Sequence, residues 1–169
     1  MKNLKWILYT CLVVFFASCG YQFEGGGYIN KDVSSVAVRA LENTSSETGA
    51  GIAFTNALIQ EIIQKTDTKV VEESLASAFL EGTIKGITFT TLSRSTTESV
   101  LERRISATVD LKLINREGEV IWSASDFTSY EDYTVSQDNI TDEDNKKAAV
   151  DKIAIRSAEK LISNLMTNF

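Results

Sequence analysis

The chain has 169 residues, of which 43% are hydrophobic, and a formal net charge of −6 at pH 7. This acidic balance disfavours nucleic acid as a partner, because nucleic-acid-binding domains present a basic face. The sequence contains no histidine and only two cysteines. Without histidine the commonest general base and metal ligand is missing, and catalytic triads of the Ser-His-Asp and Cys-His kinds are impossible.

The first 18 residues have the features of a secretory leader. Two lysines in MKNLK precede the apolar run WILYTCLVVFF, which ends at the small residues Ala17 and Ser18. A basic start, a short apolar segment and a small-residue cut site are typical of signal peptides. The run is shorter than the roughly 20 residues that a membrane-spanning helix needs. We therefore expect residues 1–18 to be removed as a lipoprotein-type signal peptide, which disfavours a retained transmembrane anchor.

Cys19 is the expected first residue of the mature chain. The segment Phe16-Ala17-Ser18-Cys19 resembles the lipobox of bacterial lipoproteins, with Phe16 where leucine is usual. In that family the cysteine thiol receives a diacylglycerol, and cleavage occurs just before it. Cys11 leaves with the leader, so lipidation accounts for the one remaining thiol and anchors the chain to a membrane. Gly20 follows, and the resemblance implies sorting to the outer membrane. The alternative is secretion with a coincidental cysteine.

The stretch 19–31 is rich in glycine and is expected to be a flexible tether between the lipid and the domain. Residues 32–169 are predicted to form a single domain. A short β-type run at 33–38 is followed by turn residues at 42–51. The segment IAFTNALIQEIIQK (52–65) repeats its apolar residues at helical spacing. We predict an amphipathic helix that packs on the core; docking on a membrane is the alternative for its apolar stripe.

Residues 68–127 predict a series of strands. TKVV (68–71) is short, whereas 79–92 alternates and slips by one residue at Gly86, which predicts a β-bulge. Residues 93–99 are polar and suit a hairpin tip. The segment 103–115 alternates strictly, and REGE (116–119) is a tight turn before a strand at 120–127. These strands predict an antiparallel meander with one apolar and one polar face.

The end of the chain completes the predicted architecture. Residues 128–141 are predicted to be a loop, and a second amphipathic helix is predicted to start within 141–145, where acids favour a helix start, and to run to the C-terminus. The predicted fold class is α+β and two-layered, with two amphipathic helices on one face of a mostly antiparallel, twisted sheet of about four to five strands. The acids of 138–145 lack the glycine turn of a calcium loop, so no metal site is predicted.

Several motifs, in order, are similar to those of the LptE family, the lipopolysaccharide-assembly lipoproteins of Gram-negative outer membranes. The motifs are CGYQF (19–23), ENTSSETG (42–49), FTNALIQEI (54–62), FLEGTIKGI (79–87), VDLKLINREGEVIW (109–122), EDYTVS (131–136) and AAVDKIAIRSAEKLI (148–162). The chain has no proline, whereas many relatives carry prolines in loops. The resemblance implies a lipoprotein that is not an enzyme and needs no cofactor. It would plug the LptD β-barrel, assist its assembly and help to insert lipopolysaccharide into the outer leaflet.

Candidate contact residues follow from this implied role. A barrel lumen is polar, so polar residues on the outward face of the strands are candidates for partner binding, with nearby aromatic residues added: Thr83, Thr88, Thr90, Ser106, Thr108, Tyr130 and Tyr133. Phe127 is a candidate for either this surface or the core. Lipopolysaccharide phosphates would be matched by cations near the hairpin tip: Arg94, Arg103 and Arg104, with Lys85 and Lys112 behind them. The alternatives are an ordinary solvated sheet face, and a generic periplasm-facing scaffold lipoprotein that binds another envelope protein.

Overall fold

The computed structural model describes residues 26–94 and 100–167 of the chain. These residues contain two helices and six strands. The helices are α2 (Ala50–Lys65) and α3 (Asn139–Thr167). The strands are β1 (Ser35–Val38), β2 (Glu42–Asn43), β3 (Lys69–Val70), β4 (Ala78–Arg94), β5 (Val100–Asn115) and β6 (Val120–Thr134). The predicted signal peptide, Cys19 and residues 95–99 of the predicted hairpin tip lie outside the described residues, whereas residues 93 and 94 of that tip belong to β4.

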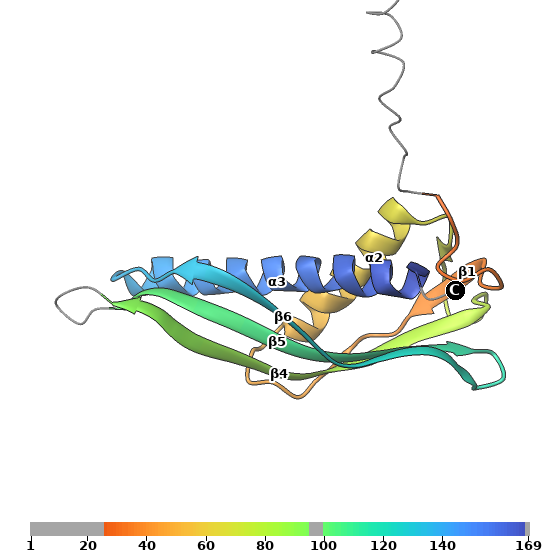
Figure 1. Cartoon of the computed structure of the whole chain (residues 1–169), viewed down its shortest axis with the longest axis horizontal. Coiled ribbons are helices and arrows are strands. Elements are labelled where there is room, and N and C mark those ends of the chain that lie inside the picture. Colours follow the sequence, from red (N-terminus) through yellow and green to blue (C-terminus); the bar gives the residue numbers. More distant parts are fainter. Residues whose placement is uncertain (1–25, 95–99, 168–169) are drawn as a thin grey trace, which may run out of the picture.

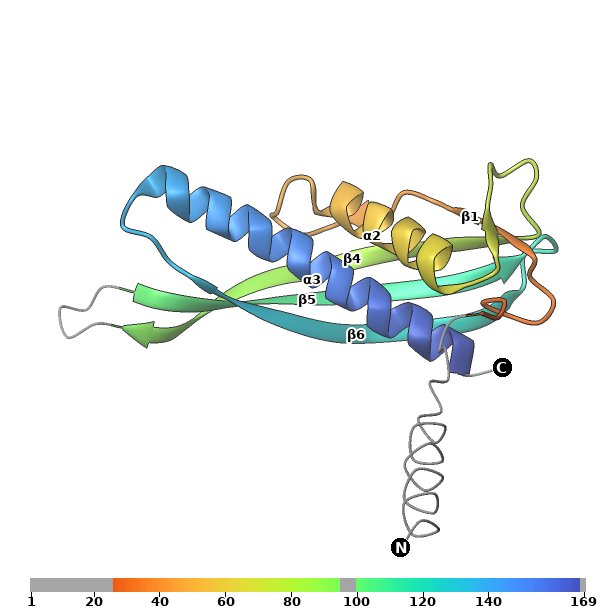
Figure 2. The same ribbon diagram turned by 90° about the horizontal axis from the view of Figure 1, so that it is seen from above.

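The strands form one sheet in the order β3-β1-β4-β5-β6, with β2 paired to β4 (Figure 1). Strands β4, β5 and β6 form the predicted antiparallel meander. The pairs β1–β3, β1–β4 and β2–β4 are parallel. The predicted sheet of four to five mostly antiparallel strands is therefore corrected to a mixed sheet of six. Both helices lie on the same face of it, and α3 runs along the meander (Figure 2).

The apolar face of the sheet and the apolar stripes of the helices form one continuous core. On β5, Ile105, Val109 and Leu113 are fully buried, as the period-two pattern predicts. Phe54 of α2 and Ile153 of α3 belong to the same cluster. Full burial of one such side chain contributes roughly 1.5–3 kcal/mol. The contact between the helix layer and the sheet is thus the main source of stability, and it leaves the opposite sheet face free of helices.

The long strands carry several register shifts, including the following two. Ile84 and Gly86 pair with consecutive residues of β5, so Lys85 is the extra residue of a β-bulge. The buried positions change from Ile84 to Ile87 across it, which confirms the predicted slip. The second irregularity lies in β6, where Asp126 has a φ of 53°. The two bulges lie on either side of β5 and increase the local twist of the sheet.

The segment 128–134 continues β6, although the sequence predicts a loop there. Two polar residues on its helix-facing side interrupt the alternation of apolar and polar residues that would predict a strand. The hydroxyl of Ser129 is hydrogen-bonded to that of Ser157, and Glu131 forms a 2.8 Å ion pair with Arg156, both on α3. These polar groups are satisfied across the two layers, so the strand persists without apolar side chains at these positions.

Other boundaries also differ from the predicted ones. α3 begins at Asn139, because the carboxylate of Asp138 accepts hydrogen bonds from the backbone N–H and the hydroxyl of Thr141. The predicted turn at 42–51 contains the short strand β2. Residues 26–31 fall within the predicted tether, but Ile29 is fully buried and its N–H donates to Thr68 Oγ1 at 2.9 Å. The packed domain therefore begins before residue 32.

Candidate functional site

The candidate site is the face of the sheet opposite the helices, which we call the outer face. Its side chains alternate along β4, β5 and β6 with the buried ones, and no helix covers them (Figure 1). The structure brings six of the predicted partner-binding residues to this face: Thr83, Thr88, Thr90, Ser106, Thr108 and Tyr130.

Short hydroxyl side chains occupy the middle of the outer face. Thr88 pairs with Ser106 across β4 and β5. Thr108 pairs with Thr128 across β5 and β6, and their Oγ1 atoms are 3.4 Å apart. A hydroxyl donates one hydrogen bond and accepts two. This part of the face can therefore form hydrogen bonds with another polar protein surface.

Arg104 lies toward the β4–β5 hairpin end of the outer face. Its Nε and Nη2 donate to the two carboxylate oxygens of Asp132 on β6, at 2.7 and 2.9 Å. The guanidinium lies 4.2 Å from the ring centroid of Tyr130. The hydrogen bond from Arg104 holds the pKa of Asp132 below its usual value. These donors already have an acceptor, so a lipopolysaccharide phosphate would have to compete with Asp132 for them.

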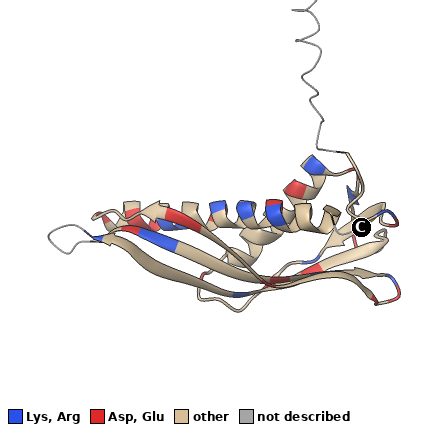
Figure 3. Cartoon of the chain, in the orientation of Figure 1, with Lys and Arg blue, Asp and Glu red and all other residues tan. Residues whose placement is uncertain are grey.

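Lys85 and Lys112 are also paired with acids. Lys85 Nζ lies 2.5 Å from Asp126 Oδ1 and 3.6 Å from Asp110 Oδ2. The side chain at the β4 bulge thus forms an ion pair with the side chain at the β6 bulge. The hydrogen bond to Asp126 raises the pKa of Lys85. Lys112 Nζ lies 3.3 Å from Glu81 Oε1. Basic and acidic segments accordingly lie close together on the long strands (Figure 3). On the outer face, Lys85, Arg104 and Lys112 thus each have an acid partner.

The predicted cationic patch is not assembled on one face. Arg103 pairs with Tyr133 and has the parity of buried Ile105, so it lies on the helix-facing side of β5, whereas Arg104 faces outward. Arg94 is the last residue of β4 and is exposed. The cluster of Arg94, Arg103 and Arg104 is therefore corrected to cations spread over both faces of the hairpin.

Only one of the aromatic candidates lies on the outer face. Tyr130 is 50% exposed there, whereas Tyr133 is 8% exposed and meets the Phe89 ring edge-on at a centroid distance of 6.3 Å. Tyr133 thus packs in the core and does not lie on the outer face. Phe127 is partly buried and packs against the same core.

The sequence interpretation missed the acidic residues that neutralise the cations. Opposite charges occur at outward positions of neighbouring strands, which is a pattern that favours cross-strand pairs. The register of the strands decides which residues meet, and the two bulges change that register. The acids that the structure places against the predicted cations are Glu81, Asp110, Asp126 and Asp132.

Residues 26–94 and 100–167 offer neither a metal-binding cluster nor a membrane-spanning helix. These residues contain no group of three or more histidine, cysteine, aspartate or glutamate side chains that could hold a metal ion. Neither α2 nor α3 is long and apolar enough to cross a membrane.

The structure defines a two-layer α+β domain with two helices on one face of an open, mixed sheet. The chain belongs to the LptE family, described as lipopolysaccharide-assembly, whose sequence model matches residues 33–165. No curated protein sequence matches the chain.

The fold is similar to that of solved lipoprotein structures, including the following two. Lipoprotein B from Nitrosomonas europaea has a TM-score of 0.57 and 15% identity, over 85% of this chain and 88% of its own. The rare lipoprotein B from Shewanella oneidensis has a TM-score of 0.52 and 16% identity, over 76% of this chain and 94% of its own. At this level of identity the likeness shows the fold alone.

Proposed function

We propose that this chain is an outer-membrane lipoprotein, anchored through an acylated Cys19, that plugs an LptD-type β-barrel. In this role it assists assembly of the barrel and helps to insert lipopolysaccharide into the outer leaflet, without catalysis or a cofactor. Membership of the LptE family supports a role in lipopolysaccharide assembly. The leader and the lipobox-like segment support the anchor. The observation that carries the barrel contact is the helix-free, polar outer face, whose cations Lys85, Arg104 and Lys112 are paired with acids.

The length and chemistry of this face suit a barrel lumen. The strands β4, β5 and β6 have 17, 16 and 15 residues. At about 3.4 Å per residue such strands reach roughly 50 Å, about twice the 25 Å apolar band of an outer-membrane barrel. The inner wall of such a barrel is polar. Hydroxyl groups can exchange water for contacts with a polar wall, and each cation of the face keeps an acid partner when water is removed.

The proposed lipopolysaccharide contact lies at the β4–β5 end of the sheet. Arg94, Arg103 and Arg104 lie there in the β4–β5 hairpin. A guanidinium fork binds phosphate through two parallel hydrogen bonds, so phosphate can replace Asp132 on Arg104. Lys85 and Lys112 are less suited, because Lys85 lies near the middle of the long strands and Lys112 near their opposite end.

Photocrosslinking in living cells tests the barrel contact. We expect a photoreactive residue at Ser106 or Thr108 to capture one large outer-membrane barrel, through residues that face its lumen. A probe at Lys160, exposed on α3, reports the helix layer for comparison. Capture of only a different envelope protein would favour the scaffold alternative. Barrel capture from Lys160 but not from either strand position would show that the wrong face is assigned.

A further inference from the structure

The two helices leave a groove between them on the side of the helix layer that faces away from the sheet. The buried residues of α2 and α3, such as Phe54 and Ile153, face the sheet, so the exposed residues between the helices line the opposite side. A cavity of about 550 Å³ lies there, where α2 and α3 run side by side (Figure 2). A cavity of about 460 Å³ shares Ala53 and Asp151 with it, so this helix groove continues to the segment 46–49 before α2.

Each wall of the helix groove is a row of side chains spaced four residues apart. Residues at this spacing lie on one face of a helix. The rows are Ala53, Ala57 and Glu61 on α2, and Asp151, Ile155 and Glu159 on α3. The alanines leave room in the groove, because each carries only a methyl group. Ile155, in the middle of its row, is 52% exposed, so the groove has an apolar surface at its centre.

The carboxylates of the helix groove are not neutralised by a cation of the domain. Within residues 26–94 and 100–167, no ion pair involves Glu61, Asp151 or Glu159. Burial raises the pKa of Glu61, and the charge of Glu159 on the facing helix raises it further. Lys65, one turn along α2, offsets part of this increase but forms no ion pair with Glu61. Two carboxylates of the groove therefore repel each other.

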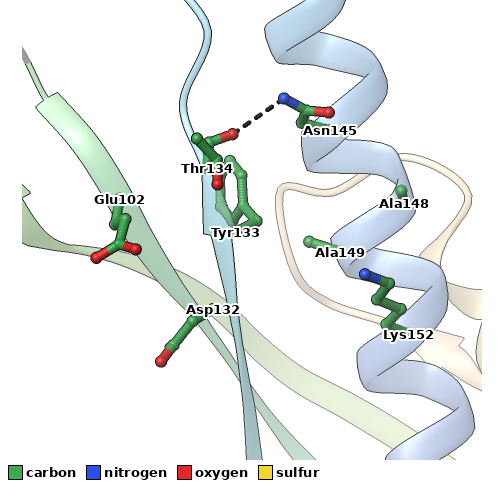
Figure 4. A pocket seen from close by; sticks show the side chains of 8 residues that line it. All are labelled: Glu102, Asp132, Tyr133, Thr134, Asn145, Ala148, Ala149 and Lys152. Atoms are coloured by element: carbon green, nitrogen blue, oxygen red, sulfur yellow. Dashed lines mark hydrogen bonds between the residues drawn. The ribbon is translucent and has the colours of Figure 1, made fainter.

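The acids around another cavity differ in this respect. A cavity of about 270 Å³ lies between β6 and α3, and Glu102 and Asp132 are among the residues that line it (Figure 4). Glu102 accepts a hydrogen bond from the hydroxyl of Ser93 at 3.2 Å, and Asp132 is paired with Arg104. These carboxylates already have donors, whereas those of the helix groove lack a cation. The charge of the helix groove thus favours a cationic partner.

We infer that the helix groove docks a basic, amphipathic helix of a second protein partner. A lysine or arginine of this helix lies between Glu61 and Glu159, where its charge offsets the repulsion between the two carboxylates. An apolar side chain one turn away covers Ile155, since residues four apart share a helix face. The walls of the groove have the four-residue spacing of helix ridges, which allows a third helix to pack between them.

The charge and shape of the helix groove disfavour two other occupants. Contact between the helix grooves of two copies of this chain would place carboxylates against carboxylates. An outer-membrane barrel has a wall of strands and therefore presents no helix to the groove. The inference goes beyond the proposed function, because the groove lies on the helix layer and the proposed barrel contact lies on the outer face (Figure 2). The two contacts can therefore be tested separately.

A photoreactive residue at Gln60 tests the helix groove in the full-length chain in living cells. Gln60 is exposed and lines the groove. We expect mass spectrometry to find it cross-linked to a segment with apolar residues at helical spacing and a lysine or arginine within one turn. The double variant Glu61→Gln/Glu159→Gln should lower this capture at least tenfold, because it removes both charges and keeps the shape. Glu117→Gln, at an exposed acid in the turn between β5 and β6, is the matched control and should leave capture unchanged.

Stability of the purified variants separates docking from folding. We expect the double variant to unfold at the same or a higher denaturant concentration than the wild type, since it removes a repulsion from the free chain. Lower stability would assign the two carboxylates to the fold and overturn the inference. The same conclusion would follow from no capture at Gln60, from equal capture by the double variant and the wild type, or from capture only of a second copy, of the barrel or of a segment without lysine or arginine. Failure of barrel capture from Ser106 and Thr108, with capture from Gln60 intact, would overturn the proposed function alone.

Discussion

Replacing Phe54 with alanine is expected to lower the free energy of unfolding by about 3–5 kcal/mol. Phe54 is 2% exposed and lies on the face of α2 that joins the core cluster. The loss combines the transfer energy of the phenyl ring with the cavity left between the two layers. A typical domain has a total stability of roughly 5–15 kcal/mol, so this variant would lose a large share of it. Denaturant unfolding followed by circular dichroism measures the change.

Ile52→Ala is the matched control for this substitution. Ile52 lies on the same helix but is 70% exposed. Its loss removes little buried area, and alanine has the higher helix propensity, so we expect stability within about 0.5 kcal/mol of the wild type. Similar losses for Phe54→Ala and Ile52→Ala would contradict the orientation of α2 in the structure.

Gly82→Ala is expected to destabilise the domain by about 3 kcal/mol, the upper end of the usual range for over-packing. A Cβ atom at Gly82 would lie 2.2 Å from the carbonyl oxygen of Asp110 and 3.0 Å from Leu111 Cδ1. The oxygen belongs to the backbone of β5, so the clash is relieved only if β4 and β5 move apart. Thermal or denaturant unfolding of the purified domain measures the loss.

Gly86 provides the control in the same strand. A Cβ atom there meets no atom within 4 Å, and the backbone does not adopt a positive φ. Gly86→Ala should therefore leave stability unchanged or raise it by up to about 1 kcal/mol, because alanine restricts the unfolded chain. If Gly86→Ala were the more damaging substitution, close packing of β4 on β5 at Gly82 would not be the reason for glycine in this strand.

The elements that the sequence predicts best are those whose burial has a simple period. β5 exposes every second residue, and the core positions of α2, such as Phe54 and Leu58, recur at helical spacing. The slip near Gly86 was also readable, because the buried positions change parity from Ile84 to Ile87. The sequence does not predict the role of Gly82, since this role depends on how closely the backbone of β5 approaches that of β4.

The missed features depend on contacts between distant segments. The far half of β6 carries Ser129 and Glu131 on its helix-facing side, and only their partners on α3 make these residues compatible with a strand. The parallel pairs of β1, β2 and β3 are two or three residues long, so each leaves little periodic pattern in the sequence.

Only part of the candidate site could be predicted from the sequence, because its ion pairs also depend on contacts between distant segments. Alternation along β4 and β5 is sufficient to place Thr88, Ser106 and Thr108 on one face. Alternation does not show which acids the cations pair with, because the strand register and the bulges bring Lys85 and Arg104 to their acids. Parity alone could have placed Arg103 on the opposite side from Arg104.

Native mass spectrometry of the chain, purified from outer membranes in mild detergent, is the most direct test of a plug with an apolar core and a polar outer face. We expect one particle that contains a single acylated copy beginning at Cys19 and a single large barrel. A free monomer with an unmodified N-terminus, and no barrel in the spectrum, would contradict it.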